Sequence, residues 1–340
     1  MAAKPVDPLT SRDPRITHGR ATLHDRNYHY LLGLPKGGDY SHTIFLIHGF
    51  PDLSMGWRCQ IPMLVDMGLR VVAPDMMGYG GTDAPRVPPE SMHLYGFKRA
   101  ADDIAELACQ LGESQIVLGG HDWGGMIVWR TAQWHPELVT HIINLTPYAG
   151  PGKDFVSLEQ LAKGPLPLLG YQLQFAGPEV EGRAQTRSQI KAFLNGLFGG
   201  RGPNGEAGIS AQKGILFDNL PKLGIARPWG DEMVEYYADQ YARNGLHGPL
   251  NWYRTRRANY EDELQLRKHT IEVPTLFIQA TCDPILRPWM SKNLERHVTN
   301  VVRAQVDATH WILIEKPDEV NKIVHQWLVK NGLGRAHSNL

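Results

Sequence analysis

The aspartate at position 122 has the clearest chemical signature in this chain. It lies in the run Gly120–Gly125 (GHDWGG), which follows the strand-like Gln115–Leu118 and precedes the helical Met126–Arg130. A potential nucleophile between small residues, at a turn from a strand into a helix, is typical of a nucleophile elbow, with aspartate where serine is usual. The simpler interpretation is an aspartate that caps an ordinary helix. Because the strand and helix context is satisfied, we predict that Asp122 is a nucleophile.

An acid and a base are expected after the nucleophile, in that order. Asp283 follows the strand-like run Pro274–Ile278, and His310 follows the run Val301–Val306. Alone, Asp283 is an ordinary turn former before a proline, and His310 is an ordinary polar residue. Their order, their types and their positions after strands together predict a triad of Asp122, Asp283 and His310.

A carboxylate nucleophile restricts the chemistry more than a serine does. An ionised carboxylate attacks without help from a base, which favours displacement at a saturated carbon and an enzyme ester. His310 would then activate water to hydrolyse this ester, and Asp283 would orient the imidazole. The loop His48–Pro51 and the elbow itself offer the backbone N–H groups of Phe50 and Trp123 as an oxyanion hole. No step requires a metal or an organic cofactor.

The leaving group remains open at this point. A departing halide needs indole or amide N–H donors, whereas the oxygen of an opened epoxide is a strongly basic alkoxide that needs a proton donor. A tyrosine hydroxyl, with an ordinary pKa of about 10, is protonated at neutral pH and can donate. The segment after Gly150 contains several tyrosines, at positions Tyr171, Tyr236, Tyr237, Tyr241, Tyr253 and Tyr260. Composition does not choose among them.

These residues require a scaffold that brings the ends of strands together. Short β-branched runs bounded by Gly or Pro alternate with helical patterns, which is typical of a parallel sheet flanked by helices. The expected elements are strands at Thr43–Ile47, Arg70–Ala73, Gln115–Leu118, His141–Leu145, Pro274–Ile278 and Val301–Val306, a preceding hairpin of His18–Leu23 and Tyr28–Leu32 with its turn at Asp25–Asn27, and a helix at Phe97–Leu111. Asp75 also ends a strand, but it precedes the nucleophile, and we interpret it as structural.

The alternation of strands and helices stops near residue 150. Strand-like runs then become scarce, and helical patterns such as Asp231–Asn244 dominate until the strands return at Pro274. We therefore expect an α/β fold with a mostly parallel sheet flanked by helices, in which 1–149 and 262–340 form the core and 150–261 an inserted, mainly helical cap. Ligands of such sheets bind at the carboxyl ends of the strands, where a cap would lie.

Composition excludes several functional classes. Lys and Arg together number 35, as do Asp and Glu, so no net field favours nucleic acid or an anionic membrane. The three cysteines are odd in number and scattered, which argues against a disulfide framework or a zinc site. No apolar run reaches the length of a membrane span or resembles a signal peptide, so we expect a cytoplasmic protein. The C-terminal Ser338–Leu340 only faintly resembles a peroxisomal signal.

The whole chain resembles a cap-containing soluble epoxide hydrolase of the α/β-hydrolase fold. The resemblance rests on His48–Pro51, Gly120–Gly125, Leu250–Arg254 and the segments around Asp283 and His310. It implies that the substrates are a small-molecule epoxide and water. The larger members of the family carry an additional phosphatase domain, for which this chain has no room.

In that family, two cap tyrosines polarise the epoxide oxygen. The matching positions are Tyr253, in Asn251–Arg254 (NWYR), and Tyr171, in Tyr171–Phe175 (YQLQF). Gln174 stands where the family commonly has an aromatic residue, so the second match is looser. The resemblance further implies that substrate is bound by Phe50, Pro51, Trp123, Gln172, Trp252 and Trp311.

Two other functions compete with this one. A haloalkane or haloacetate dehalogenase shares the aspartate nucleophile and the histidine, and Trp123 could donate to its halide. The haloalkane enzymes usually carry asparagine where Phe50 stands, so Phe50 and the Tyr253 segment favour an epoxide hydrolase. A non-catalytic ligand receptor on the same fold is the second alternative, against which the complete triad argues. The sequence leaves open the choice of epoxide, the oligomeric state and a role in detoxification, metabolism or signalling.

Overall fold

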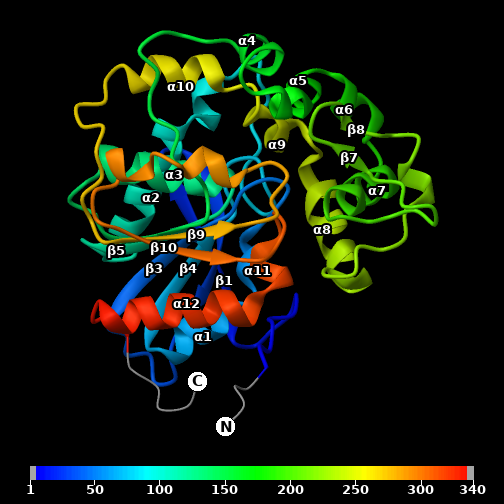
Figure 1. Cartoon of the computed structure of the whole chain (residues 1–340). Coiled ribbons are helices and arrows are strands. Elements are labelled where there is room, and N and C mark those ends of the chain that lie inside the picture. The colour runs from blue at the N-terminus through cyan, green and yellow to red at the C-terminus, as the bar shows by residue number, and fades with distance from the viewer. Residues whose placement is uncertain (1–4, 335–340) are drawn as a thin grey trace. The chain divides into compact units, whose positions relative to one another are not determined.

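An eight-stranded, mostly parallel sheet organises the first of two compact units in the computed structural model, which describes residues 5–334 (Figure 1). The strands are β1 (Ile16–Leu23), β2 (Arg26–Gly33), β3 (His42–Ile47), β4 (Leu69–Pro74), β5 (Ile116–Gly120), β6 (Val139–Asn144), β9 (Thr275–Ala280) and β10 (Val301–Val306), in the order β1-β2-β4-β3-β5-β6-β9-β10. The pairs β1–β2 and β2–β4 are antiparallel, and all other neighbours are parallel. The carboxyl ends of the parallel strands therefore meet at one edge of the sheet.

The parallel strands β3, β4, β5 and β9 are buried runs, as the sequence predicts, whereas β10 at the edge of the sheet is largely accessible. β10 has the predicted limits, whereas β5 ends two residues later than predicted. Gly119 and Gly120 continue the pairing of β5, opposite Leu46 and Ile47 of β3. A pair of glycines usually indicates the end of a strand, but here it carries the strand to the residues just before Asp122.

The N-terminal hairpin is present with a tighter turn than predicted. β1 and β2 pair up to Leu23 and Arg26, which leaves only His24 and Asp25 between them. Both have a positive φ, of 44° and 66°, as a two-residue turn that matches the twist of the strands requires. The predicted turn at Asp25–Asn27 was therefore wrong by about one residue, because a turn-prone sequence does not reveal which residues take this conformation.

Helices cover both faces of the sheet (Figure 1). They are α1 (Ile61–Asp66), α2 (Phe97–Gln110), α3 (Trp123–Trp134), α11 (Ile312–Glu315) and α12 (Pro317–Lys330), with 3-10 turns η1 (Ser54–Trp57), η5 (Pro288–Ser291) and η6 (Leu294–Arg296). α1 and α12 lie along one face, and α2 and α3 lie along the other. α3 begins directly after Asp122 and contacts β3, β5 and β6, so the elbow stands over the middle of the sheet.

The second unit, Met77–Arg99 with Pro151–Gln265, is mainly helical. Its elements are η2 (Met92–Tyr95), α4 (Leu158–Lys163), η3 (Pro167–Leu169), α5 (Gly170–Ala176), α6 (Glu179–Arg183), α7 (Arg187–Leu197), β7 (Ile209–Ser210), β8 (Gly214–Ile215), η4 (Leu220–Lys222), α8 (Gly230–Asn244), α9 (His247–Asn251) and α10 (Arg256–Glu263). α8 begins one residue before the predicted helix and ends where predicted. The core of this unit contains packed aromatic rings. The rings of Phe198 and Trp229 stack with centroids 3.9 Å apart, and both contact Tyr237.

The segment Met77–Arg99 groups with the helical unit. Gly78 lies so close to Gly248 that a Cβ added to it would be 2.8 Å from the backbone of that residue. The N–H of Phe97 donates to the side-chain oxygen of Asn259 at 2.8 Å. The domain limits inferred from the sequence, which stay a prediction, place this segment in the core. The division of the structure into two compact units differs from those limits mainly at this segment.

None of the helices within residues 5–334 is long and apolar enough to cross a membrane. The three cysteines all lie in the described part of the chain and are free thiols. Ser338–Leu340, the segment compared with a peroxisomal signal, lies outside the described residues.

Candidate active site

Asp122 occupies the sharp turn between β5 and α3. Its backbone has φ 55° and ψ −127°, a conformation that is costly for any residue other than glycine. Although Asp122 stands at the N-cap position of α3, its side chain makes no capping hydrogen bond. Oδ1 instead accepts a hydrogen bond from the N–H of Phe50 at 2.7 Å. The side chain therefore serves no helix cap, and the strained turn presents a carboxylate to another loop.

Two glycines allow the backbone to approach this turn closely. A Cβ at Gly49 would lie 2.3 Å from Oδ1 of Asp122, and a Cβ at Gly124 would lie 2.1 Å from the carbonyl oxygen of Ile47. Both distances are far inside van der Waals contact, so any side chain at these positions would force the loops apart. The glycines of the two motifs are thus required by the approach of the loop after β3 to the elbow.

The side chain of Asp122 is largely buried, with 13% of it exposed, and it accepts hydrogen bonds from backbone N–H groups. Burial raises the pKa of Asp122 above its ordinary value and is the largest influence on it. His310 and the backbone N–H groups of Phe50 and Trp123 act in the opposite direction. These two N–H groups are the pair that the sequence predicts as an oxyanion hole. Thr146, which sequence analysis missed, donates its hydroxyl to the backbone carbonyl of Asp122 at 3.0 Å.

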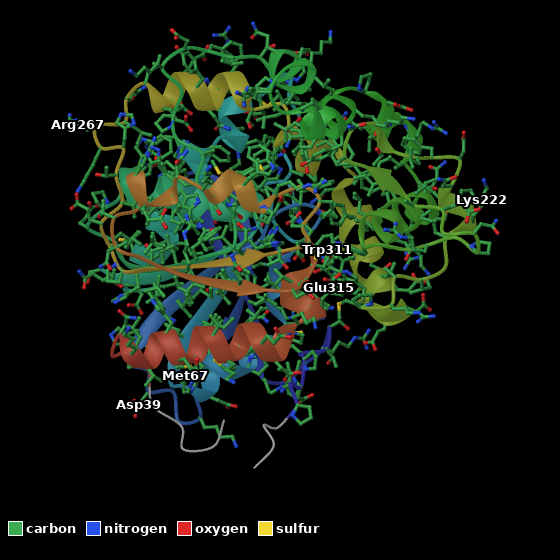
Figure 2. All side chains as sticks on the ribbon, in the orientation of Figure 1. Asp39, Met67, Lys222, Arg267, Trp311 and Glu315 are labelled. Carbon is green, nitrogen blue, oxygen red and sulfur yellow. The ribbon has the colours of Figure 1, made fainter. Side chains whose placement is uncertain are left out.

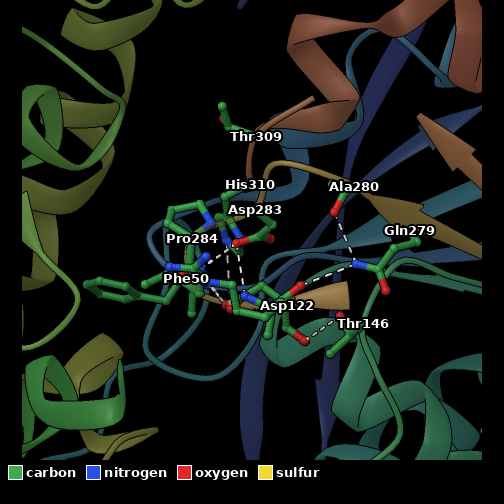
Figure 3. Close-up of polar contacts among 12 residues, drawn as sticks. Phe50, Asp122, Thr146, Gln279, Ala280, Asp283, Pro284, Thr309 and His310 are labelled. Carbon is green, nitrogen blue, oxygen red and sulfur yellow. Dashed lines mark hydrogen bonds and ion pairs between the residues drawn. The ribbon is translucent and has the colours of Figure 1, made fainter. Parts of the chain in front are cut away.

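Asp283 holds both its own turn and the imidazole of His310 (Figure 3). Its Oδ1 accepts hydrogen bonds from the N–H groups of Ile285 at 2.7 Å and Leu286 at 2.9 Å. Its Oδ2 lies 2.8 Å from Nδ1 of His310. Burial raises the pKa of Asp283, but His310 and these hydrogen bonds outweigh it and lower the pKa to about 2. One carboxylate oxygen of Asp283 therefore holds the turn, and the other contacts the imidazole.

His310 lies between the two carboxylates. Its Nδ1 faces Asp283, and its Nε2 lies 3.8 Å from Oδ2 of Asp122. Burial lowers the pKa of His310, whereas Asp283 and then Asp122 raise it, with a net result of about 9. The imidazole is therefore protonated at neutral pH in this structure, and its charge is balanced by the two neighbouring anions.

The loop that carries His310 is fixed from two sides. The N–H of Cys282 donates to the carbonyl oxygen of Ala308 at 3.0 Å, which ties this loop to the loop of Asp283. Glu315, at the end of α11 (labelled in Figure 2), accepts from the N–H of Thr309 at 2.8 Å and from its hydroxyl at 2.7 Å. The position of the imidazole thus depends on contacts on both sides of it in the chain.

The two motif histidines have supporting positions. The Nδ1 of His48 lies 2.8 Å from the carbonyl oxygen of Gly49, and its Nε2 accepts from the N–H of Met76 at 3.0 Å, so the proton is on Nδ1. The ring of His121 packs with its centroid 4.8 Å from that of His310. Burial, together with the charge of His310, lowers the pKa of His121 to about 3. His121 therefore packs against the imidazolium without adding a charge.

Asp75 belongs to a separate hydrogen-bond chain. Its Oδ1 accepts from the N–H of Ser54 at 2.9 Å, and its Oδ2 lies 2.7 Å from Nδ1 of His29. The other ring nitrogen of His29 lies 2.8 Å from the ring of His18. Burial raises the pKa of Asp75, but His29 outweighs it and the pKa is lowered to about 2. This chain orders the start of η1, a structural role, and the histidines had given no signal in the sequence.

Tyr171 and Tyr253 are neighbours within the helical unit. Tyr171 is the second residue of α5, Tyr253 lies just after α9, and their ring centroids are 6.0 Å apart. Phe175 contacts both rings, with centroid distances of 5.3 and 5.0 Å. The amide of Gln172 donates to the hydroxyl oxygen of Tyr171 at 3.1 Å. The two tyrosines that the resemblance selects are therefore held together by a residue, Phe175, that sequence analysis did not single out.

The other predicted substrate-binding residues have different surroundings. Trp311 (labelled in Figure 2) is buried, with its ring centroid 5.2 Å from that of His310. Pro51 is buried in the loop that presents the N–H of Phe50. Trp252 is buried in the helical unit, where its indole N–H donates to the carbonyl of Met77 at 3.0 Å. This bond favours a packing role for Trp252, and contact of these residues with substrate stays a prediction.

Gln174, where the family commonly has an aromatic residue, has a defined role. Its Oε1 accepts from the N–H of Ile215 at 2.6 Å, and its Nε2 donates to the carbonyl of Ile215 at 3.3 Å and to Glu179 at 3.0 Å. The amide thus pairs with the backbone of β8 as a neighbouring strand would, which an aromatic ring cannot do. The departure from the family pattern attaches α5 to the small β7–β8 hairpin.

Comparison with known proteins identifies the family. The chain matches the model of the alpha/beta hydrolase fold over residues 42–317. It is 38% identical to epoxide hydrolase srdG of Neurospora crassa, over 95% of this chain and 98% of that protein. It is 35% identical to bifunctional epoxide hydrolase 2 of Rattus norvegicus over 92% of this chain, but it spans only 55% of that protein. The crystal structure of epoxide hydrolase A from Mycobacterium thermoresistibile matches with a TM-score of 0.76 and 26% identity, over 94% of this chain and 100% of that one. The chain therefore belongs to the epoxide hydrolases of the α/β-hydrolase fold family.

Proposed function

We propose that this protein adds water to epoxides and forms vicinal diols through a covalent ester of Asp122. The observation that carries the proposal is the setting of this carboxylate, with the N–H of Phe50 on one oxygen and His310 3.8 Å from the other. A carboxylate in this position is a nucleophile for a saturated carbon, because it needs no base to activate it. Membership of the epoxide hydrolase family supports an epoxide as the substrate.

In the first step, Oδ2 of Asp122 attacks a ring carbon of the epoxide. The bond between this carbon and the ring oxygen breaks as the ester bond to Asp122 forms. Oδ1 becomes the carbonyl oxygen of the ester and keeps the hydrogen bond from Phe50. The ring oxygen remains on the neighbouring carbon as an alkoxide and takes a proton from the hydroxyl of Tyr171 or Tyr253.

The helical unit acts in this proposal as the cap that brings the proton donors. Both tyrosines are buried, and a hydrogen bond to a developing alkoxide is stronger in such surroundings than in water. Gln172 donates to the hydroxyl oxygen of Tyr171 and would stabilise the phenolate that forms when this residue gives up its proton. Two donors on one oxygen allow the negative charge to be shared.

Formation of the ester changes the protonation of His310. The ester removes the negative charge of Asp122, which is one of the charges that raise the pKa of His310, so this pKa falls. The imidazolium then returns a proton to the tyrosinate through solvent and becomes a neutral base. This transfer restores the cap tyrosine before the second step.

In the second step, neutral His310 takes a proton from a water molecule that attacks the carboxyl carbon of Asp122. The anionic oxygen of the tetrahedral intermediate is stabilised by the N–H groups of Phe50 and Trp123. Asp283 stabilises the imidazolium. Collapse of the intermediate breaks the ester bond, and the departing alkoxide takes the proton of the new carboxyl group. The diol leaves, the oxygen of the water remains in Asp122, and His310 is protonated again.

A single turnover of styrene oxide in water labelled with heavy oxygen tests this route. With enzyme in excess, the first diol should carry no label, and mass spectrometry should find the label in the peptide that contains Asp122. The reaction should proceed at the same rate in the presence of a metal chelator. Label that appears directly in the first diol would exclude the ester. Halide release from haloalkanes, with no turnover of a broad epoxide panel, would instead indicate a dehalogenase, and inactivity on both would favour a ligand receptor.

A further inference from the structure

The guanidinium of Arg254 joins separate segments of the helical unit. Its Nε donates to the carbonyl oxygen of Ala176 at 3.0 Å, and its Nη2 donates to the carbonyl oxygen of Gly177 and to Oε2 of Glu181, each at 3.2 Å. Its Nη1 donates to the side-chain oxygen of Asn251 at 2.8 Å. A planar guanidinium, whose donors have fixed directions, is suited to holding these four acceptors at once.

These contacts connect the two segments that carry the tyrosines. Ala176 is the last residue of α5, and Tyr171 is the second. The carbonyl groups at this end of the helix lack partners within it and carry partial negative charge, so a cation stabilises them. Arg254 directly follows Tyr253 in the chain. Its side chain therefore ties the end of the Tyr171 helix to the residue next to Tyr253.

Glu181 fixes the position of Arg254. The second carboxylate oxygen of Glu181 lies 3.0 Å from Nδ1 of His247, and Nε2 of His247 accepts from the N–H of Val87 at 3.0 Å. Burial raises the pKa of Glu181, but His247 and Arg254 outweigh it, and this pKa lies below its ordinary value. The carboxylate is thus ionised at neutral pH, and its side chain is only 28% exposed. Arg254 has a fixed counter-charge in addition to its backbone acceptors.

We propose that Arg254 is a positioning residue for ring opening, which sets the distance and the angle between Tyr171 and Tyr253 so that both hydroxyl groups reach one epoxide oxygen. This inference rests on the proposed function. Phe175 contacts both rings, while Arg254 fixes the backbone segments from which the rings project. Loss of the guanidinium displaces the proton donors but leaves the groups that hydrolyse the ester, Asp283 and His310, in place.

The proposal predicts that substitution of Arg254 separates the two chemical steps. In Arg254→Met, rapid-quench single turnovers of styrene oxide should show ring opening slowed roughly tenfold to a hundredfold, the range expected for a misplaced catalytic group. Hydrolysis of the ester, followed after it has formed, should change by no more than about twofold. Arg254→Lys should recover thermal stability in part but not the rate, because an ammonium cannot hold the same four acceptors.

Arg187→Met is the matched control. Arg187 lies in the same unit and pairs with Glu235 and Asp239 of α8, each at 2.6 Å. It should lower the melting temperature and leave both steps unchanged. If Arg254→Met does not fold, Glu181→Gln removes the counter-charge more gently and should slow ring opening in the same selective way.

Three outcomes overturn the positioning role. Equal slowing of both steps, or no slowing in a variant that is destabilised as much as the control, would reduce Arg254 to a structural residue. In a Tyr253→Phe background, Arg254→Met should have a smaller effect than in the parent, because one of the groups it positions is already missing. Fully additive effects would also contradict the proposal. A parent protein that does not open epoxides contradicts the proposed function itself, which is a separate result.

Discussion

The sheet unit and the helical unit hold the side chains of the proposed mechanism by different means. In the sheet unit, Asp122, Asp283 and His310 each follow a parallel strand, and the loops that carry Asp283 and His310 are joined by backbone hydrogen bonds such as that from Cys282 to Ala308. In the helical unit, Tyr171 projects from the short helix α5 and Tyr253 from the turn that follows α9. Their segments are connected through side chains, chiefly Arg254 and Phe175.

This difference has a functional consequence. A loop that directly follows a parallel strand is anchored by the sheet at that end, and the loops of Asp283 and His310 are also joined to each other, so a reactive group there should keep its place when a nearby side chain changes. A helix held by side chains can shift by a few tenths of an ångström when one contact is lost. Substitutions in the sheet unit should therefore remove a chemical step. Substitutions in the helical unit should instead change the rate of ring opening by degrees and alter the preference of the enzyme among epoxides.

The largest effect is expected for His310→Gln. Glutamine retains a polar group but cannot act as the base, so the ester of Asp122 should form and persist. Steady-state turnover of styrene oxide should fall by roughly a thousandfold or more. Mass spectrometry of the intact protein should show an adduct of one substrate molecule, located on the peptide that contains Asp122.

His135→Gln is the control for this variant. His135 also pairs with an aspartate, Asp102, at 2.9 Å in the sheet unit, but it lies outside the triad. Turnover should be unaffected and no adduct should accumulate. If His310→Gln were slow without an adduct, histidine would be needed for ring opening, and the division of labour between the two units would be wrong.

A smaller effect is expected for the tyrosines. Tyr253→Phe and Tyr171→Phe each remove one donor to the alkoxide and leave the other, so each should slow ring opening by roughly tenfold to a hundredfold. The double variant should be far slower than either. Ester hydrolysis should keep its rate in all three, which rapid-quench measurements can show. Tyr236→Phe, on α8 of the same unit, should retain the parent rate, and an unchanged rate in Tyr253→Phe would remove this residue from the site.

The same contrast explains what the sequence could predict. Asp122, Asp283 and His310 were predicted together because a buried apolar run followed by a polar residue indicates the end of a parallel strand, and such ends meet at one edge of a sheet. Their mutual distances could not be predicted, because they depend on the approach of loops that only glycine permits, as at Gly49. Tyr171 and Tyr253 were selected by resemblance to a family, since helical spacing does not distinguish them from other tyrosines.

Other contacts left no signal at all in the sequence. The bonds of Arg254 to the end of α5, and of Gln174 to β8, join a side chain to a distant backbone, where any residue can offer the carbonyl. The grouping of Met77–Arg99 with the helical unit has the same origin, because its contacts to α9 and α10 include the close approach of Gly78 to Gly248 and the bond from the backbone N–H of Phe97 to Asn259. Periodicity describes the faces of elements and not these connections.

The smallest expected effect is a dependence of stability on pH that differs between the two units. The pKa of His310 is about 9 in the folded protein, whereas the ordinary value for a histidine without these partners, as in the unfolded chain, is 6.5. Below pH 6.5 both the folded and the unfolded state bind this proton, and the stabilisation is complete. Between pH 6.5 and 9 only the folded state keeps it, so the free energy of unfolding should fall as the pH rises, by at most about 1.4 kcal/mol per pH unit.

Urea unfolding across this pH range tests the assignment. His310→Gln should flatten the decline, and His135→Gln should retain it. Glu181→Gln should act at the acidic end of the pH range. The pKa of Glu181 is lowered in the folded protein, so its ionised carboxylate stabilises the fold at pH values above the ordinary pKa of 4.5. This stabilisation is lost as the pH falls below 4.5. If Glu181→Gln altered the alkaline decline, or His310→Gln left it intact, the charges of the two units would not act separately. The expected result is that the two variants respond at opposite ends of the pH range. The pair of His310 and Asp283 would then limit stability in alkali, and the pair of Arg254 and Glu181 would limit it in acid.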